Sequence, residues 1–258
     1  MEFYTMNPEV LLSRIRVVLC RTSHPGNIGA AARAMKTMGL SKLYLVEPKK
    51  FPDQEADIRA TGAVDVLENA TVTSSLKDAL VGASYVVALS ARQRDIGPVI
   101  GAPRETVARL LMEAGQGDVA LVFGNETVGL SNEEILHCHA AVSIPTNTEF
   151  SSLNLGSAVQ VLCYECRMAA FDSRPPAIEQ GVTPFSSPMA THDEVEGFYA
   201  HLEAVMTDTG FFNPEQPGRL LPKLRRLYGR VRLEKDEINI LRGILASTQV
   251  NTSHGRKR

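Results

Sequence analysis

Ile144-Pro-Thr-Asn-Thr-Glu-Phe-Ser-Ser-Leu-Asn-Leu-Gly-Ser-Ala158 is the stretch on which the predicted fold depends, because a buried strand ends in it and a helix begins in it. Residues 141–144 form a short apolar run, and Pro145 ends that run by removing a backbone donor. Apolar residues then recur at steps of three and four: Leu155, Val159, Leu162 and Cys166. This spacing predicts a helix over about 152–170 with one face in a core.

Polar residues occupy the predicted first turn of this helix. Ser151, Ser152 and Asn154 can cap its unpaired backbone N–H groups, or those N–H groups can be offered to a ligand. Capping alone explains such residues when they are taken by themselves. The ligand interpretation therefore depends on what other segments bring to the same place.

Composition restricts the class of protein. The chain has 258 residues and 44% hydrophobic content, which is ample for a core. It shows no apolar run long enough to predict a membrane span, and no N-terminal pattern that predicts a signal peptide. We expect a cytoplasmic protein. Four cysteines do not indicate a disulfide scaffold, and Cys163 and Cys166 lie inside the predicted helix, so we expect no metal site. The net charge of -2 means that any nucleic acid must be bound by local basic patches.

Strands and helices alternate before this stretch. The predicted strands are 14–20, 43–46, 85–89 and 118–123, and helical segments follow at 28–38, 53–59, 75–80 and 104–114. Such alternation predicts an α/β domain with a mostly parallel sheet. Polar loops follow three of the strands, at 90–94, 124–131 and 145–154. Because the carboxyl ends of parallel strands meet at one edge, we expect a ligand crevice there. The Gly97-Pro98 segment after the first loop is predicted to be irregular.

The remaining segments divide the chain further. Residues 1–13 show no clear pattern and are predicted to be an N-terminal extension, and 14–171 form the α/β domain. Residues 172–190 are rich in proline and serine, which indicates a linker. A small all-α domain is predicted over 191–258, with a capping box at Thr191 and Glu194. Basic residues gather in it, with Glu215 as the one acidic residue among Arg219, Lys223, Arg225, Arg226, Arg230 and Arg232.

Several functions fit these features. A Rossmann dehydrogenase lacks support, because the loop after the first strand offers only Gly26 and Gly29 instead of G-x-G-x-x-G. A non-catalytic RNA-binding module remains open. So does an enzyme that modifies nucleic acid, with a small cofactor in the crevice and the polymer on the basic patch.

Three motifs, in order, resemble those of the SPOUT methyltransferases, in the TrmH-like branch of ribose 2'-O-methylases. They are Pro25-Gly-Asn-Ile-Gly-Ala-Ala-Ala-Arg33, Leu121-Val-Phe-Gly-Asn-Glu-Thr-Val-Gly-Leu130, and Ile144-Pro145 with Ser152-Leu-Asn-Leu155. Residues 22–27, Ser90-Ala-Arg92, 151–155 and Leu221-Pro-Lys-Leu-Arg-Arg-Leu227 are similar to the TrmJ family within that branch. The resemblance covers about residues 14–248.

The resemblance implies a C-terminal trefoil knot in the α/β domain, a homodimer, and S-adenosylmethionine bound in the knot. It implies methylation of the ribose 2'-hydroxyl of the pyrimidine, cytidine or uridine, at position 32 in the tRNA anticodon loop; another RNA such as rRNA is the alternative. The implied cofactor residues are Leu89, Ser90, Ala91, Gly124, Ile144, Ser151, Ser152 and Leu153. The implied reaction centre is Asn27, Arg33, Glu126, Ser152 and Asn154. Candidate contacts to the tRNA anticodon stem-loop are Arg92, Arg94, Arg219, Lys223, Arg225, Arg226 and Arg230.

These residue types suit the implied chemistry. A sulfonium methyl group is already electrophilic, so the enzyme must align a weakly acidic hydroxyl and help to remove its proton. Arg33 is assigned proton removal in schemes for this branch. A guanidinium is effectively always protonated, so pairing of Arg33 with a substrate phosphate is the second possibility.

Overall fold

The computed structural model describes residues 6–90, 97–172 and 187–255. The chain separates into two compact units, residues 1–180 and 181–258, which are taken here one at a time. Ala91, Arg92 and Arg94, and most of the predicted linker, lie outside the described residues.

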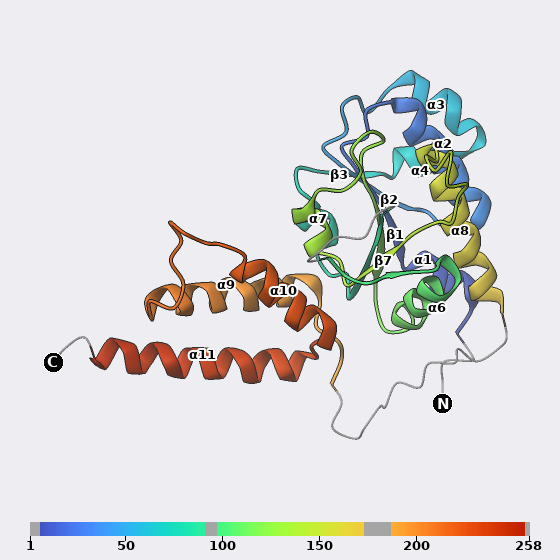
Figure 1. The fold of residues 1–258 in the computed structure, drawn as a ribbon. Coiled ribbons are helices and arrows are strands. Elements are labelled where there is room, and N and C mark those ends of the chain that lie inside the picture. The colour runs from blue at the N-terminus through green and yellow to red at the C-terminus, as the bar shows by residue number, and fades with distance from the viewer. Residues whose placement is uncertain (1–5, 91–96, 173–186, 256–258) are drawn as a thin grey trace. The chain divides into compact units, whose positions relative to one another are not determined.

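The first unit is built on a seven-stranded sheet in the order β3-β2-β1-β6-β4-β7-β5 (Figure 1). The strands are β1 (Ile15–Cys20), β2 (Lys42–Val46), β3 (Thr71–Thr73), β4 (Tyr85–Leu89), β5 (Ile100–Gly101), β6 (Val119–Phe123) and β7 (Ala140–Val142). Every pairing between these strands is parallel. The predicted parallel α/β sheet is therefore confirmed. Whether the chain forms the trefoil knot stays a prediction.

Helices cover both faces of this sheet because its central strands are apolar on both sides. In β1, Val17 and Leu19 join one buried cluster, whereas Val18 and Cys20 join another. The first cluster lies under α1 (Pro8–Ser13), α2 (Pro25–Met38), α3 (Gln54–Ala60), α4 (Val64–Glu68), α6 (Pro103–Ala114) and α8 (Leu155–Phe171). The second lies under α5 (Leu76–Leu80) and α7 (Asn132–Leu136).

Helices α2 and α3 approach each other closely at Gly29. A Cβ atom at this position would lie 2.1 Å from the carbonyl oxygen of Ala56. No side chain fits there, so the glycine lets α3 pack directly on the backbone of α2. This contact holds α3 and the 3₁₀ segment Thr61–Ala63 next to the helix that carries Asn27 and Arg33.

The structure corrects several sequence predictions in the first unit. Helix α8 begins at Leu155 rather than at 152, and Asn154 is its N-cap, its Oδ1 accepting from the backbone N–H of Gly156 at 2.9 Å. The strand before it ends at Val142, not Ile144. Helix α1 forms where no regular element was expected, because Leu12 is completely buried against the core. The segment after Gly97-Pro98 contains β5, which extends the sheet beyond β7.

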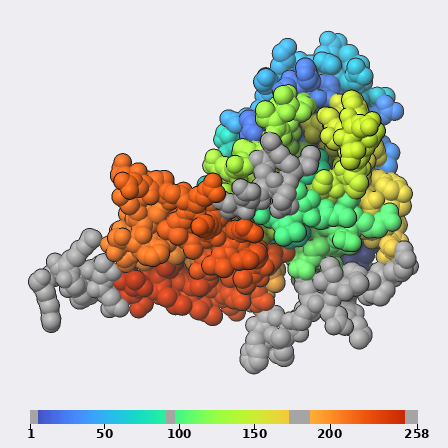
Figure 2. Space-filling view, viewed as in Figure 1, coloured from blue at the N-terminus to red at the C-terminus, as the bar shows by residue number. Residues whose placement is uncertain are grey.

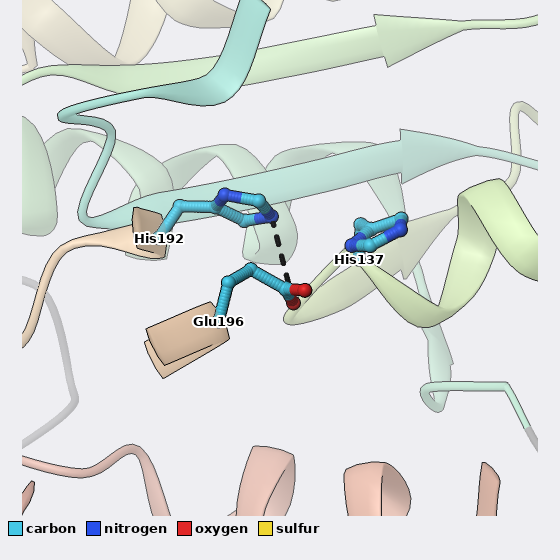
Figure 3. A group of neighbouring side chains, drawn as sticks. All are labelled: His137, His192 and Glu196. Carbon is cyan, nitrogen blue, oxygen red and sulfur yellow. Dashed lines mark ion pairs between the residues drawn. The ribbon is translucent and has the colours of Figure 1, made fainter. Parts of the chain in front are cut away.

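The second unit is all-helical, as predicted. It consists of α9 (His192–Asp208), α10 (Leu220–Val231) and α11 (Lys235–Gly255) around a small core of Ala190, Phe198 and Ile238. The predicted capping box of Thr191 and Glu194 opens α9. One turn apart on α9, His192 Nε2 lies 4.0 Å from Glu196 Oε1 (Figure 3), which is an ion pair when the histidine is protonated.

Candidate active site

A cavity of about 510 Å³ opens at the carboxyl ends of β4, β6 and β7. Ser90 and residues of the polar loops at 124–131 and 145–154 meet there, and in Figure 2 the green to yellow segments that carry these two loops reach the surface on one face of this unit. All predicted cofactor residues within the described part of the chain line the cavity: Leu89, Ser90, Gly124, Ile144, Ser151, Ser152 and Leu153. Sequence reasoning missed other lining residues, among them Phe123, Asn125, Val128, Thr146 and Leu155.

The loop after β6 is folded tightly on itself. A Cβ on Gly124 would lie 2.2 Å from the backbone of Gly129 and Leu130, so only glycine fits at the strand exit. Gly129 has φ +69°, and its N–H donates to the Asn125 carbonyl at 2.8 Å. Ser131 and Glu134 then form a capping box at the start of α7. The loop therefore has little freedom between strand and helix.

The carboxylate of Glu126 points across to the loop between β1 and α2. It accepts the backbone N–H of Ser23 at 2.9 Å, that of His24 at 3.3 Å, and the Asn27 side-chain amide at 2.9 Å. Burial by itself would raise the pKa of Glu126. The hydrogen bonds together lower the pKa by more than burial raises it, so the net pKa lies below the ordinary value of 4.5. Glu126 is therefore ionised at neutral pH and already surrounded by donors.

Asn27 and Asn154 continue this chain of hydrogen bonds. Asn27 does not cap α2, because the helix begins two residues earlier, at Pro25. Its side chain instead donates to Glu126 and accepts from Asn154 Nδ2 at 2.9 Å. Asn154 thus joins α8 to α2 while it caps its own helix. Three predicted reaction-centre residues from three motifs lie in direct contact.

Arg33 lies apart from the other predicted reaction-centre residues. Its side chain is exposed on α2 and donates to Thr61 Oγ1 at 3.5 Å, at the end of α3. It does not line the cavity, whereas Ser152 and Glu126 do. Within one chain, Arg33 is therefore free to meet a large substrate but does not contact the cavity.

Helix α10 of the second unit separates the predicted RNA-binding residues into two groups. Four of them share one side at helical spacing and are exposed: Arg219, Lys223, Arg226 and Arg230. Arg225 lies on another side, where both its Nη atoms donate to Glu196, at 2.9 Å for Nη2 and Oε2, and its guanidinium stacks on Tyr199 at 4.4 Å. Its charge is thus directed into the helical unit, which speaks against the predicted contact of Arg225 with RNA.

Comparisons with known proteins agree over nearly the whole chain. The SpoU rRNA methylase family matches residues 14–164, and the C-terminal domain family of the tRNA methyltransferase TrmJ matches residues 193–257. No described helix is long and apolar enough to cross a membrane.

Individual relatives are similar across both units. The tRNA (cytidine/uridine/adenosine-2'-O-)-methyltransferase TrmJ of Pseudomonas aeruginosa is 52% identical over 245 residues, covering 93% of this chain and 95% of that protein. The tRNA (cytidine/uridine-2'-O-)-methyltransferase TrmJ of Yersinia enterocolitica is 49% identical, with 93% of each chain covered. The crystal structure of TrmJ from Z. mobilis ZM4 superposes with a TM-score of 0.77 at 32% identity, over 91% of this chain and 98% of that one.

Proposed function

We propose that this chain, which belongs to the SpoU rRNA methylase family and within it to the TrmJ family, is a tRNA ribose 2'-O-methyltransferase. It transfers a methyl group from S-adenosylmethionine to the 2'-hydroxyl of the pyrimidine at position 32 in the anticodon loop. The observation that carries the proposal is the direct contact of Asn27, Glu126 and Asn154 beside the cavity. A tRNA substrate also fits the expected cytoplasmic location.

The cavity suits S-adenosylmethionine. Its volume of about 510 Å³ lies within the usual range for small-molecule sites. Leu89, Ile144 and Leu153 supply apolar walls for an adenosine. The loop from Gly124, which packs too tightly on its own backbone for a Cβ at that position, adds further lining residues. Ser90, Ser151 and Ser152 add polar groups to the lining. These residues would hold the cofactor, whose role is to supply an electrophilic methyl group.

The residues beside the cavity would position the ribose. Glu126 is ionised and accepts several hydrogen bonds, so its role is to fix the amide of Asn27 rather than to remove a proton. Asn27 and Asn154 then present amides of defined orientation, and Ser152 adds a hydroxyl at the cavity wall. Such alignment is the main requirement when the methyl group is already reactive. Arg33, exposed on α2, would pair with a phosphate of the RNA.

The exposed basic stripe on α10 would supply further contacts to tRNA. Arg219, Lys223, Arg226 and Arg230 all face solvent from one side of the helix. Phosphate contacts of this kind give affinity without reading sequence, and they weaken as salt rises. The stripe therefore accounts for tRNA binding, whereas the cavity accounts for the reaction.

A homodimer is part of the proposal. Helix α8 exposes apolar side chains on consecutive turns, Tyr164, Met168 and Phe171, at 44%, 40% and 50%. Apolar groups grouped in this way favour a protein interface. Met168→Asp should therefore shift sedimentation toward the monomer. Ile58→Asp, at an apolar residue of α3 that is 67% exposed, is the matched control and should leave the dimer unchanged.

Methylation of defined RNAs tests the function. The protein is incubated with S-adenosylmethionine and a tRNA transcript, and nucleosides and fragments are identified by mass spectrometry. We expect 2'-O-methylcytidine or 2'-O-methyluridine at position 32, and no product from a transcript with a 2'-deoxyribose there. Methylation of rRNA but not tRNA would favour the alternative substrate that the family description names. Binding of tRNA without any product would favour a non-catalytic module.

A further inference from the structure

Asn125 lies next to Glu126 in the loop after β6, and its side chain also contacts the loop after β1. Its Nδ2 donates to the Arg21 carbonyl at 2.8 Å and to the Ser23 hydroxyl at 2.9 Å. Its Oδ1 accepts the backbone N–H groups of Thr127 at 2.9 Å and Val128 at 3.3 Å. The amide nitrogen of this side chain thus joins the two loops, and its amide oxygen holds the loop after β6 in shape.

These partners determine which way the amide points. Two backbone N–H groups require an acceptor on one side, and a backbone carbonyl requires a donor on the other. The donor end also lies 3.3 Å from Glu126 Oε2. An aspartate at this position has the same shape but no donor, so it would place an oxygen against the Arg21 carbonyl and a second negative charge beside Glu126.

Ser23 joins Asn125 to the reaction centre. Its hydroxyl accepts from Asn125, and its backbone N–H donates to Glu126 Oε2 at 2.9 Å. Glu126 in turn fixes Asn27. Displacement of Asn125 would therefore move the loop that supplies donors to Glu126, and with it the amide of Asn27.

Arg21 holds the other end of the same contact. It has φ +51°, a left-handed conformation that is uncommon for a residue other than glycine, and its carbonyl is the one that Asn125 binds. Its guanidinium makes a bidentate ion pair with Glu134 of α7, with 2.8 Å between Nη2 and Oε2. Glu134 also completes the capping box that follows the Asn125 loop. The strained backbone of Arg21 is therefore held from both sides.

We propose that Asn125 is a positioning residue of the methyl transfer, which holds Glu126 and thereby Asn27 in register by joining the loops after β1 and β6. The inference rests on the proposed methyltransferase function. Asn125 does not need to touch the substrate for this role. Its loss should therefore lower the rate of the chemical step more than it weakens cofactor binding.

The isosteric variant Asn125→Asp tests this role in the full-length protein. At saturating S-adenosylmethionine, its single-turnover rate on tRNA should fall roughly ten- to a hundredfold at neutral pH, the size of effect that a small misplacement produces. The calorimetric Kd for S-adenosylmethionine should stay within about threefold, because the hydrogen bonds within the loop after β6 are kept. Asn69→Asp makes the same change at an exposed residue outside the cavity and should leave both quantities unchanged.

The pH profile gives a reading that general loosening of the fold would not produce. When the new aspartate is protonated it regains a donor and loses its charge, so the rate of Asn125→Asp relative to wild type should rise as pH falls from about 8.5 to 6. In a Glu126→Gln background the repulsion is absent, so Asn125→Asp should reduce the single-turnover rate severalfold less than it does in the wild-type background. The inference would be overturned if the rate reductions of the two single variants simply multiplied in the double variant, or if the rate of Asn125→Asp relative to wild type were independent of pH.

A measurement without cofactor or RNA separates this inference from the function. Amide hydrogen exchange at Ser23 and His24, whose N–H groups bind Glu126, should become at least about tenfold faster in Asn125→Asp, while β6 stays protected. Unchanged exchange at both residues would refute the positioning role. A wild-type protein that methylates no tRNA would instead refute the proposed function and leave the exchange result standing.

Discussion

Replacing Arg225 by alanine should destabilise the helical unit of residues 181–258 rather than remove a contact with RNA. The guanidinium forms a bidentate ion pair with Glu196, and the two side chains are only 20% and 17% exposed. The same group stacks on the ring of Tyr199 at 4.4 Å. Alanine would remove both interactions and leave the Glu196 carboxylate without this partner in a largely buried position.

The size of the effect follows from that burial. Exposed ion pairs contribute about 0–1 kcal/mol, whereas removing one member of a buried pair costs about 3–5 kcal/mol. For a pair that is mostly but not fully buried we take about 2 kcal/mol, and the cation–π contact adds about 1 kcal/mol. A loss of about 3 kcal/mol is large for a unit whose core consists of Ala190, Phe198 and Ile238.

Hydrogen exchange on the full chain measures this loss locally. Amides of α9 and α10 should exchange roughly a hundredfold faster in Arg225→Ala, which corresponds to about 3 kcal/mol of opening free energy. Arg225→Lys keeps the charge but loses the bidentate geometry, so it should fall between wild type and alanine.

Arg230→Ala is the matched control, on the exposed basic stripe of the same helix. It should leave hydrogen exchange unchanged, while the slope of log K for tRNA binding against log salt concentration becomes shallower by about one. If Arg225→Ala behaved like Arg230→Ala in both measurements, the ion pair with Glu196 would not be what holds α10 in place.

Three further predictions concern the first unit. If Arg33 binds phosphate, Arg33→Lys should methylate more slowly than wild type but faster than Arg33→Ala at every pH, and full recovery of the lysine variant near its pKa of about 10 would instead indicate a base. Gly124→Ala should weaken calorimetric binding of S-adenosylmethionine more than about tenfold, because its Cβ would lie 2.2 Å from the Gly129 backbone, and unchanged binding would mean that the loop can yield. Glu126 has a lowered pKa, so its stabilising effect is present above its ordinary value of 4.5 and is lost as pH falls through the folded value. Urea unfolding of Glu126→Gln should thus depend less on pH in acid, and equal acid dependence would contradict this.

Features that depend on neighbouring residues in the chain could be predicted from the sequence. The apolar spacing placed Leu155, Val159 and Leu162 in the core, and all three are buried. The capping boxes at Ser131 and Thr191 are both present, since their partners lie three residues away. The parallel sheet followed from the alternation of strands and helices, because parallel strands need long crossovers.

Features that depend on distant partners could not be predicted in the same way. By residue type, Ser151, Ser152 and Asn154 could each cap α8. Asn154 is the residue that does so, and it also contacts Asn27, which lies far away in the sequence. Arg225 looks like its neighbours in a basic run, and only the position of Glu196 on another helix distinguishes it. The contacts of Asn125 likewise require two loops that meet only in the folded sheet.

The position of β6 has a consequence for the order of events during synthesis. It pairs with β1 on one side and β4 on the other, although it leaves the ribosome after both of them. A nascent chain that ends before residue 119 therefore has β1 to β3 and β4 as parts of one sheet with its central strand missing. Insertion of β6 brings Glu126 to Ser23 and Asn27 in the same step that joins the two halves. Because such long-range parallel pairing is slow and the cavity also needs residues up to Ala158, ligand binding by a ribosome-bound chain would begin only after the central strand is in place and the segment after β7 has been added.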